Sequence, residues 1–362
     1  MKAIKNNALL TILVLICIAI NCYSSNNIRV ENGYSTQFYP ILSKYFRLLF
    51  GWIPFSVGDV IYGFAIFYVA KKIFKLFWVL FKYKKNAFSG MAIRNSIYSF
   101  ACAICVLYIV FNIFWGINYN RVGIAEQLYL KVEKYSIEDL KNINFLLTEK
   151  INNTKQNIIN ANDTFISSKI MFDDTGKAYE FLSKKYSFIK YNNKSVKSSL
   201  WGWAGNYLGF LGYYNPLTAE AQVNTTVPTF TQPFTTCHEV AHQLGYAKEM
   251  EANFVGYLAA SNSTNLLFKY SVYTEIFTYA NRTLYYADST SAIQYRKLLL
   301  PQVIADFKER RKFNESHTSF IEPIISFLYG KFLEQNQQPM GILSYEEVTS
   351  FIISFYKKYR YL

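Results

Sequence analysis

The chain has 362 residues, of which 51% are hydrophobic and 19% aromatic, and it carries a formal net charge of +14. This length allows two domains. The apolar residues gather in the first third, a pattern typical of a membrane-attached chain with a globular remainder. The charge does not indicate nucleic-acid binding, because the basic residues are scattered and no nucleic-acid motif accompanies them.

Residues 1–115 are predicted to form a membrane region. Its three apolar segments predict helices near residues 8–22, 57–80 and 97–115. The first segment follows Lys2 and Lys5 and is either a signal peptide or a short membrane helix. An uncleaved anchor is favoured, because no small-residue cleavage site follows it.

The basic residues beside these segments indicate how they cross the membrane. Lysines precede the first segment, and a basic loop separates the second from the third. The basic residues of this loop region are Lys82, Lys84, Lys85 and Arg94. The positive-inside rule places both groups in the cytoplasm. The expected protein is therefore a multi-pass protein of the cytoplasmic membrane, with the lipid bilayer as a partner and its C-terminal domain on the outer side.

Residues 116–362 predict a mainly helical domain with a small sheet. Ser136 and Asp139 are expected to cap a helix that the polar residues 152–164 end. Asp173 or Asp174 is expected to open the next helix. Further predictions are strand and turn at 201–216, a short strand at 219–228, and helices at 295–311 and 345–359.

The sequence CHEVAHQLG (237–245) contains two of the three histidines of the chain. His238 and His242 lie four residues apart, so their rings face the same side of a helix and can reach one metal ion. Neutral imidazole suits Zn²⁺ near pH 7. Glu239 projects about 100° round the helix and is the predicted general base for a water activated by zinc. The pattern predicts a catalytic zinc site on a helix over residues 233–244.

The same residues allow a purely structural interpretation. Thr236 and Glu239 have the spacing of a capping box, which would start the helix at Thr236. Pro233 is the better first-turn residue, because proline is favoured at the start of a helix. The zinc site is therefore preferred over the capping box.

A catalytic zinc ion needs a third protein ligand. Gly245 is expected to end the motif helix, and Glu249 and Glu251 follow it. These two glutamates face about 200° apart on a helix, so only one can point at the metal. Glu249 is the preferred ligand and Glu251 the alternative. Asn253 lies four residues after Glu249 and is expected to orient either Glu249 or His238.

The motif with its following E-x-E-A-N resembles the glutamate-zincin peptidases, whose third ligand lies on a second helix as E-x-x-x-D. Asn253 stands where that aspartate is usual. The chain is more closely similar to bacterial membrane proteins grouped as domain of unknown function 3810 (DUF3810). The segments that carry this resemblance are IPFSVGDVIYG (53–63), FWGINYNR (114–121), NPLTAEAQVN (215–224), CHEVAHQLG (237–245), EMEANF (249–254) and GILSY (341–345). The resemblance implies a zincin-like α+β domain behind membrane helices, in the cell envelope.

Several further residues are weaker candidates for the site. Tyr213, Tyr214 and Tyr246 are candidates to stabilise an oxyanion. His317 is expected in a solvated loop, and Glu220 either binds a substrate amino group or faces water. Residues 222–226 are a candidate edge strand for an extended peptide.

The expected function is that of a membrane-anchored zinc metallopeptidase, a hydrolase acting on a peptide or protein substrate. His238, His242 and Glu249 bind the zinc, and Glu239 takes the proton of the attacking water. The alternative is a catalytically silent zinc-binding protein with a structural or sensor role in the cell envelope.

Overall fold

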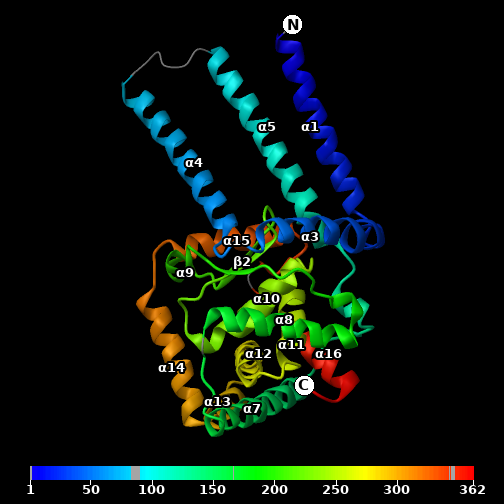
Figure 1. Ribbon diagram of the computed structural model, residues 1–362, viewed down its shortest axis with the longest axis vertical. Helices are drawn as coiled ribbons and strands as arrows, with labels where there is room; N and C mark the ends of the chain where they lie inside the picture. The colour runs from blue at the N-terminus through cyan, green and yellow to red at the C-terminus, as the bar shows by residue number, and fades with distance from the viewer. Residues whose placement is uncertain (1, 83–89, 166, 342, 344–346) are drawn as a thin grey trace. The chain divides into compact units, whose positions relative to one another are not determined.

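The computed structural model describes residues 2–82, 90–165, 167–341, 343 and 347–362 (Figure 1). These residues form two compact units. Unit 1 comprises residues up to Leu42 together with Val57–Arg121, and unit 2 comprises Ser43–Ser56 together with Val122–Leu362. The chain is mostly helical with a small three-stranded sheet, as the sequence predicts.

Unit 1 consists of helices. They are α1 (Lys2–Ser24), α2 (Asn27–Arg29), a π-helix (Val30–Phe38), the start of α3 (Tyr39–Phe50), α4 (Val57–Lys82), α5 (Gly90–Phe114) and a 3-10 helix (Gly116–Asn120). Helix α1 packs along α5. The Tyr34 hydroxyl donates to the carbonyls of Asn112 at 3.2 Å and Ile113 at 2.9 Å, which fixes the π-helix against the end of α5.

One helix among the described residues is long and apolar enough to cross a membrane, Arg94–Phe114 of α5. A second counts if Ala8–Ser24 and Asn27–Phe50, bent by 98°, form one span. Helix α4 forms at the second predicted segment but is not among these spans, and three lysines interrupt it: Lys71, Lys72 and Lys75. The three crossings therefore stay a prediction.

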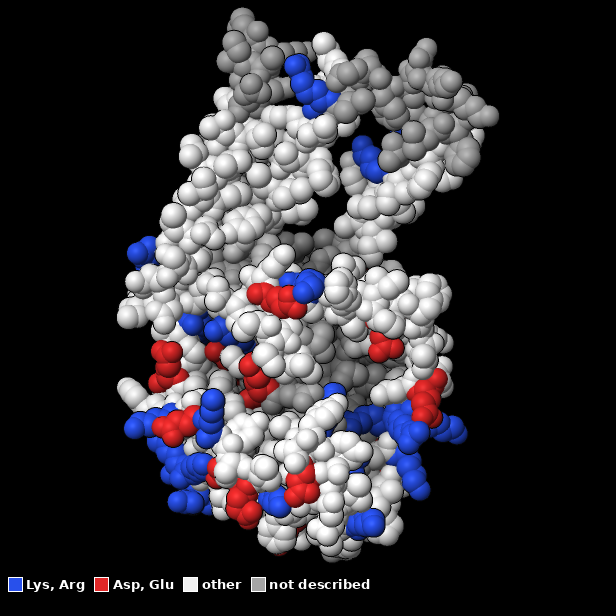
Figure 2. All heavy atoms as spheres, turned by 180° about the vertical axis from the view of Figure 1, so that it is seen from behind, with Lys and Arg blue, Asp and Glu red and all other residues white. Residues whose placement is uncertain are grey.

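The charge clues to the topology lie largely outside the described residues. Residues 83–89, with Lys84 and Lys85 of the predicted cytoplasmic loop, are not described, and neither are residues 342, 344 and 345 of the GILSY segment. The side chains of Lys2, Lys5 and Lys82 are not described either. Figure 2 shows long uncharged flanks on the described helices of unit 1 and many charged side chains on unit 2.

Unit 2 surrounds a small sheet with helices. Its helices are the end of α3, α6 (Ile124–Gln127), α7 (Ile137–Asn160), α8 (Ser168–Lys185), α9 (Gly202–Leu208), α10 (Gln232–Gln243), α11 (Glu249–Ser261), α12 (Leu266–Ala287), α13 (Ser289–Lys297), α14 (Pro301–Ser316), α15 (Glu322–Gln335) and α16 (Val348–Tyr359), with 3-10 turns at Ser187–Ile189 and Thr229–Thr231. Its strands are β1 (Val196–Ser198), β2 (Gly212–Asn215) and β3 (Glu220–Val223).

Helix α7 begins with the predicted capping box of Ser136 and Asp139. Residues 152–164 do contain the end of this helix, but later than their polarity suggests, because it runs to Asn160 and buries Thr154 and Ile158 on its continuing inner face. The start predicted for the next helix is too late. Helix α8 begins at Ser168, where the Ser167 side chain accepts the Ile170 N–H.

Residues 201–216 contain strand β2, as predicted, but also helix α9. The sheet order is β1-β3-β2, with β1 parallel and β2 antiparallel to β3. The prediction of an edge strand at residues 222–226 is therefore wrong, because β3 is the central strand. On its other side β2 has no strand neighbour among the described residues, so β2 is an edge.

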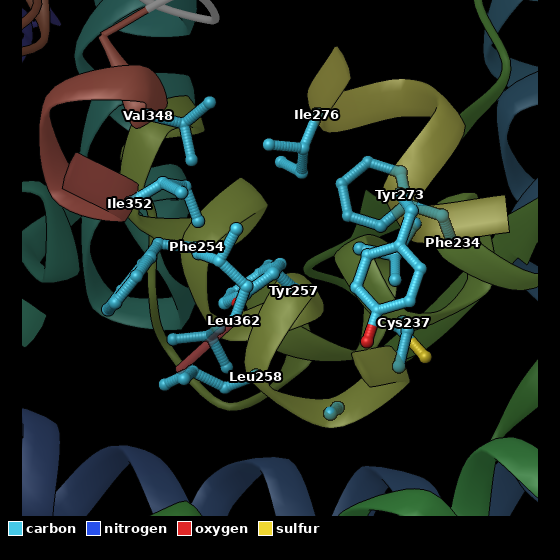
Figure 3. Close-up of a cluster of buried hydrophobic side chains, with 14 of the residues drawn as sticks. Phe234, Cys237, Phe254, Tyr257, Leu258, Tyr273, Ile276, Val348, Ile352 and Leu362 are labelled. Carbon is cyan, nitrogen blue, oxygen red and sulfur yellow. The ribbon is translucent and has the colours of Figure 1, made fainter. Parts of the chain in front are cut away.

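The core of unit 2 is built round α10 and α11. All twelve residues of α10 are buried. Gly256 of α11 lies so close to α10 that a Cβ there would be 3.1 Å from the His238 backbone nitrogen. Behind this crossing, Phe254 and Leu258 of α11 pack with Ile352 of α16 in an apolar cluster (Figure 3). The motif helix is thus held rigidly on several sides.

The segment Ser43–Ser56 packs with unit 2 although it lies between helices of unit 1 in the sequence. The buried Lys197 ammonium donates to the carbonyls of Phe50, Ile53 and Phe55. It also lies 3.5 Å from the fully buried Glu220 carboxylate. Burial lowers the pKa of Lys197, and Glu220 partly offsets this effect.

Lys197→Met is expected to destabilise unit 2 by about 3–5 kcal/mol, because it leaves the Glu220 carboxylate buried without its cation. Denaturant unfolding of the full chain in detergent measures this loss. The exposed Lys190 supplies the control, since Lys190→Met removes the same charge near the sheet. Equal midpoints for both variants would show that the buried pair does not hold the segment.

Candidate metal centre

Helix α10 presents the two histidines from its interior. It runs from Gln232 to Gln243 with proline in its first turn, close to the predicted range. Gly245 has φ +88°, its N–H donates to the His242 carbonyl, and the Tyr246 N–H donates to the Ala241 carbonyl. This pairing is a Schellman motif, in which glycine accepts the left-handed conformation at little cost. The chain then turns back, and Glu249 opens α11.

Three side chains converge between α10 and α11. The ligand atoms of His238, His242 and Glu249 all lie within 4.8 Å of one another. The Glu249 Oε2 atom is 3.2 Å from His238 Nε2 and 3.5 Å from His242 Nε2. All three residues are buried. The structure therefore brings together a group that could hold a metal ion.

Two of the separations between these atoms fit a tetrahedral ion. Zinc ligands at about 2.0–2.1 Å from the metal lie roughly 3.3 Å from one another. The two separations from Glu249 Oε2, 3.2 Å and 3.5 Å, match this edge length. Glu249 Oε2 is buried and accepts no well-directed hydrogen bond from a described residue. Since a buried carboxylate oxygen normally has a partner, a cation among the three residues would complete its coordination.

Groups behind the ligands fix their orientation. His242 Nδ1 is 2.8 Å from the Tyr246 carbonyl. The carbonyl only accepts, so Nδ1 carries the proton of the neutral ring and Nε2 is the nitrogen that can bind a metal once its own proton has left. The Tyr329 hydroxyl of α15 donates to Glu249 Oε1 at 2.6 Å, and the Glu249 backbone N–H donates to the Gln338 side chain at 2.8 Å. Glu249 is thus held at two points while Oε2 faces the histidines.

Glu239 lies beside this group, with its carboxylate against strand β2. An ideal Cβ on Gly212 would lie 2.6 Å from Glu239 Oε1, so only glycine leaves room for the carboxylate there. Glu239 Oε2 is buried without a hydrogen-bond partner among the described residues. Burial raises the pKa of Glu239 to about 7, although the two imidazoles act in the opposite direction. A carboxyl group with this pKa is suited to accept a proton near neutral pH.

The ligand residues are electrostatically coupled. Burial favours neutral His242, but the Glu249 carboxylate outweighs this effect and raises the pKa of His242 to about 9. Burial likewise disfavours the Glu249 carboxylate, but His242 and His238 hold its pKa well below the usual range. His242 therefore carries a proton at neutral pH that a metal ion must displace.

Metal affinity is accordingly expected to rise with pH, by about tenfold per unit up to the His242 pKa of about 9. Below that pH each bound ion releases about one proton from His242, and above it none. Calorimetry of zinc binding in buffers of different ionisation enthalpy measures this release. A flat affinity between pH 6 and pH 8 would contradict the proton competition.

The two remaining candidates, Glu251 and Asn253, lie on α11 close to Glu249. Glu251 is buried, but its Oε1 lies 3.9 Å from Lys248 Nζ and against Gly123, outside the ligand group. This matches the expectation that only one of the two glutamates points at the histidines. Asn253 is buried one turn after Glu249, and its predicted orienting role stays a prediction.

The weaker candidates are not part of the ligand group. The Tyr246 hydroxyl donates to Gln127, and the Tyr213 hydroxyl is 3.1 Å from Ser199 Oγ. Tyr214 lies on β2. The His317 ring packs edge-on against Tyr207, and Glu220 is enclosed by Lys197, Ser56, Thr218 and Gln222 rather than facing water.

Tyr329 and Gly212 are the site residues that sequence reasoning missed. Tyr329 is one of 31 tyrosines and lies 80 residues after Glu249, so no spacing connects them. Gly212 lies in a glycine- and aromatic-rich stretch whose composition predicts only strand and turn. Both residues act through contacts that the fold creates.

Tyr329→Phe is expected to weaken zinc binding by about 10- to 100-fold, because Glu249 Oε1 loses its donor and the carboxylate can rotate. Competition with a zinc chelator measures the change. Tyr356→Phe provides a matched control, since Tyr356 lies on α16 and outside the ligand group. An unchanged affinity in Tyr329→Phe would show that the hydroxyl does not position the ligand.

Comparison with known proteins gives one result. The family model described as "Protein of unknown function (DUF3810)" matches residues 34–353. No curated protein and no solved structure matches the chain. The match spans the metal centre, the sheet and most of unit 1, and the chain therefore belongs to the DUF3810 family.

Proposed function

We propose that this protein is a membrane-anchored zinc-dependent metallopeptidase of the glutamate-zincin type. The convergence of His238, His242 and Glu249, with the Glu239 carboxylate beside them, is the observation that carries the proposal. Two nitrogens and one carboxylate oxygen are the ligand set of several catalytic zinc sites. When bound, zinc supplies a Lewis acid that makes water nucleophilic near neutral pH and polarises a carbonyl group.

The chain itself supplies the remaining parts of the reaction. Glu239 accepts a proton from the attacking water and can return it to the leaving amine, because its pKa of about 7 allows both steps. Strand β2 is an edge strand of the sheet, and its Gly212 contacts the Glu239 carboxylate. An extended peptide that pairs with β2 would place its backbone next to the general base.

The proposed location is the bacterial cytoplasmic membrane, with three membrane helices and unit 2 on the outer side. Support comes from the one or two candidate spans among the described residues and from the positive residues flanking the apolar segments. A reporter fusion after Leu362 tests the orientation. Activity only of a reporter that folds outside the cytoplasm is the expected result.

The activity is tested by incubating the zinc-loaded full chain with a peptide library and identifying the products by mass spectrometry. New peptide termini are expected, and they should disappear with a zinc chelator and return when zinc is restored. Absence of cleavage by a chain that holds zinc would overturn the peptidase assignment and leave the metal site intact.

A silent zinc-binding role is the second candidate, and one observation favours it. His238, Glu239, His242 and Glu249 are each less than 10% exposed, which is typical of a closed structural site. In cells, a defect caused by His238→Ala but not by Glu239→Gln would support this candidate. Equal defects in both variants would support catalysis.

A further inference from the structure

Helix α15 is apolar on most sides but hardly buried. Of its residues Glu322–Gln335, all of which are described, only Gly330 and Leu333 are buried. Phe327 is 63% and Leu328 58% exposed. A helix that is hydrophobic all round is normally enclosed by protein or by lipid. The described part of unit 2 covers little of α15, so another surface is required to cover it.

Helix α9 extends this exposed surface. The two helices contact each other, with Glu322 lying against Gly209. Trp203 is 62% and Tyr207 44% exposed. We use the term apolar face for the exposed side chains of Trp203, Tyr207, Phe320, Ile324, Phe327 and Leu328. Contiguous exposed patches of this kind mark protein or membrane contacts.

The segment Ser43–Ser56 gives a reason to choose the membrane. It lies at the same end of unit 2 as α9 and α15 (Figure 1). It exposes further aromatic side chains, with Tyr45 at 66% and Trp52 at 78%. Its last residue, Ser56, is followed directly by the 26-residue apolar helix α4. This end of unit 2 therefore continues along the chain directly into an apolar helix.

We propose that the apolar face, together with Tyr45 and Trp52, rests in the headgroup region of the lipid bilayer. Tryptophan and tyrosine favour this region because their rings are apolar and their polar atoms remain hydrated. Phe327 and Leu328 reach towards the acyl chains. The charged pair of Lys331 and Glu334, 2.7 Å apart, is exposed at the end of α15, where water and headgroups solvate it.

This contact determines which substrates the site can reach. Tyr329 lies on α15 and donates to Glu249 Oε1 at 2.6 Å, so the metal centre lies directly behind the helix that contacts lipid. The substrate class, which rests on the proposed peptidase function, is then the extended segment of a polypeptide emerging from the same membrane.

The lipid contact is tested on the full chain in lipid nanodiscs with nitroxide spin labels. Cys17, Cys22, Cys102 and Cys105 are first replaced by alanine, whereas the fully buried Cys237 stays because reagents do not reach it. Labels are attached to Phe327→Cys or Trp203→Cys, and Tyr286→Cys is the matched control. Tyr286 is 81% exposed near the end of α12 and is not among the residues of the apolar face. Collisions with oxygen, which concentrates in lipid, are compared with collisions with a water-soluble nickel chelate.

The labels at positions 327 and 203 are expected to collide often with oxygen and rarely with the nickel chelate. The label at position 286 is expected to collide freely with the nickel chelate. Equal rates of collision with the nickel chelate at positions 327 and 286 would overturn the proposal. Labels that neither reagent reaches would also overturn the proposal, because protein would then cover the apolar face. Spin–spin broadening would identify the covering protein as a second copy of the chain, and its absence would identify it as unit 1. The measurement needs neither metal nor turnover, so its failure is distinguishable from failure of the peptidase proposal.

Discussion

Glu239→Gln is expected to lower peptide hydrolysis by about 10²- to 10⁴-fold while zinc binding persists. Glutamine keeps the shape of the side chain beside Gly212 but cannot accept the proton of the attacking water. Zinc remains because Glu239 is outside the ligand group. Initial rates on a peptide substrate and zinc content of the same preparation measure the two effects separately.

Glu251→Gln is the matched control for this substitution. It removes the charge of another buried glutamate, which lies near Lys248 rather than the histidines. Its zinc content and most of its activity are expected to survive. An equal loss of activity in both variants would show that Glu239 has no specific role. Loss of zinc from Glu239→Gln would show that Glu239 is a metal ligand.

His238→Ala is expected to reduce zinc affinity by more than about 100-fold. This loss exceeds the one caused by substituting a residue that only hydrogen-bonds to a metal ligand. His238→Ala removes one of three ligand atoms and leaves Glu249 Oε2 with a single imidazole neighbour of the group. The expected preparation is folded and holds no zinc after dialysis. Chelator competition, with circular dichroism to establish folding, provides the measurement.

His317→Ala supplies the control, because His317 is the only other histidine in the chain. Its ring packs against Tyr207 and Phe313 rather than near the ligand group. Zinc binding is expected to equal that of the wild type. Loss of zinc from His317→Ala, or retention of a full complement in His238→Ala, would contradict the assigned ligands.

The motif helix could be predicted because its signals are local. The proline in the first turn of α10 and Gly245 after its end mark its limits, and the spacing of His238 and His242 sets their common face. The expectation that only one of Glu249 and Glu251 points at the metal rests on the 200° between them, which is also local. Helical periodicity likewise located α7, although polar residues concealed how far its buried face continues.

The rest of the site depends on packing between distant segments. Tyr329 reaches Glu249 only because α15 lies over the start of α11, and no pattern in either helix indicates this. Gly212 meets Glu239 because β2 lies beside α10. The position of β3 in the centre of the sheet depends on its pairing with β1, a strand of three residues that periodicity cannot detect.

The most direct test of the account is the zinc content of the purified full-length wild-type chain after dialysis against metal-free buffer. One zinc ion per folded chain is expected, because three buried ligand atoms that lie within 4.8 Å of one another can hold the ion together. A folded chain that contains no zinc and takes up none at neutral pH would contradict it. His238 and His242 would then be core histidines paired with a buried glutamate.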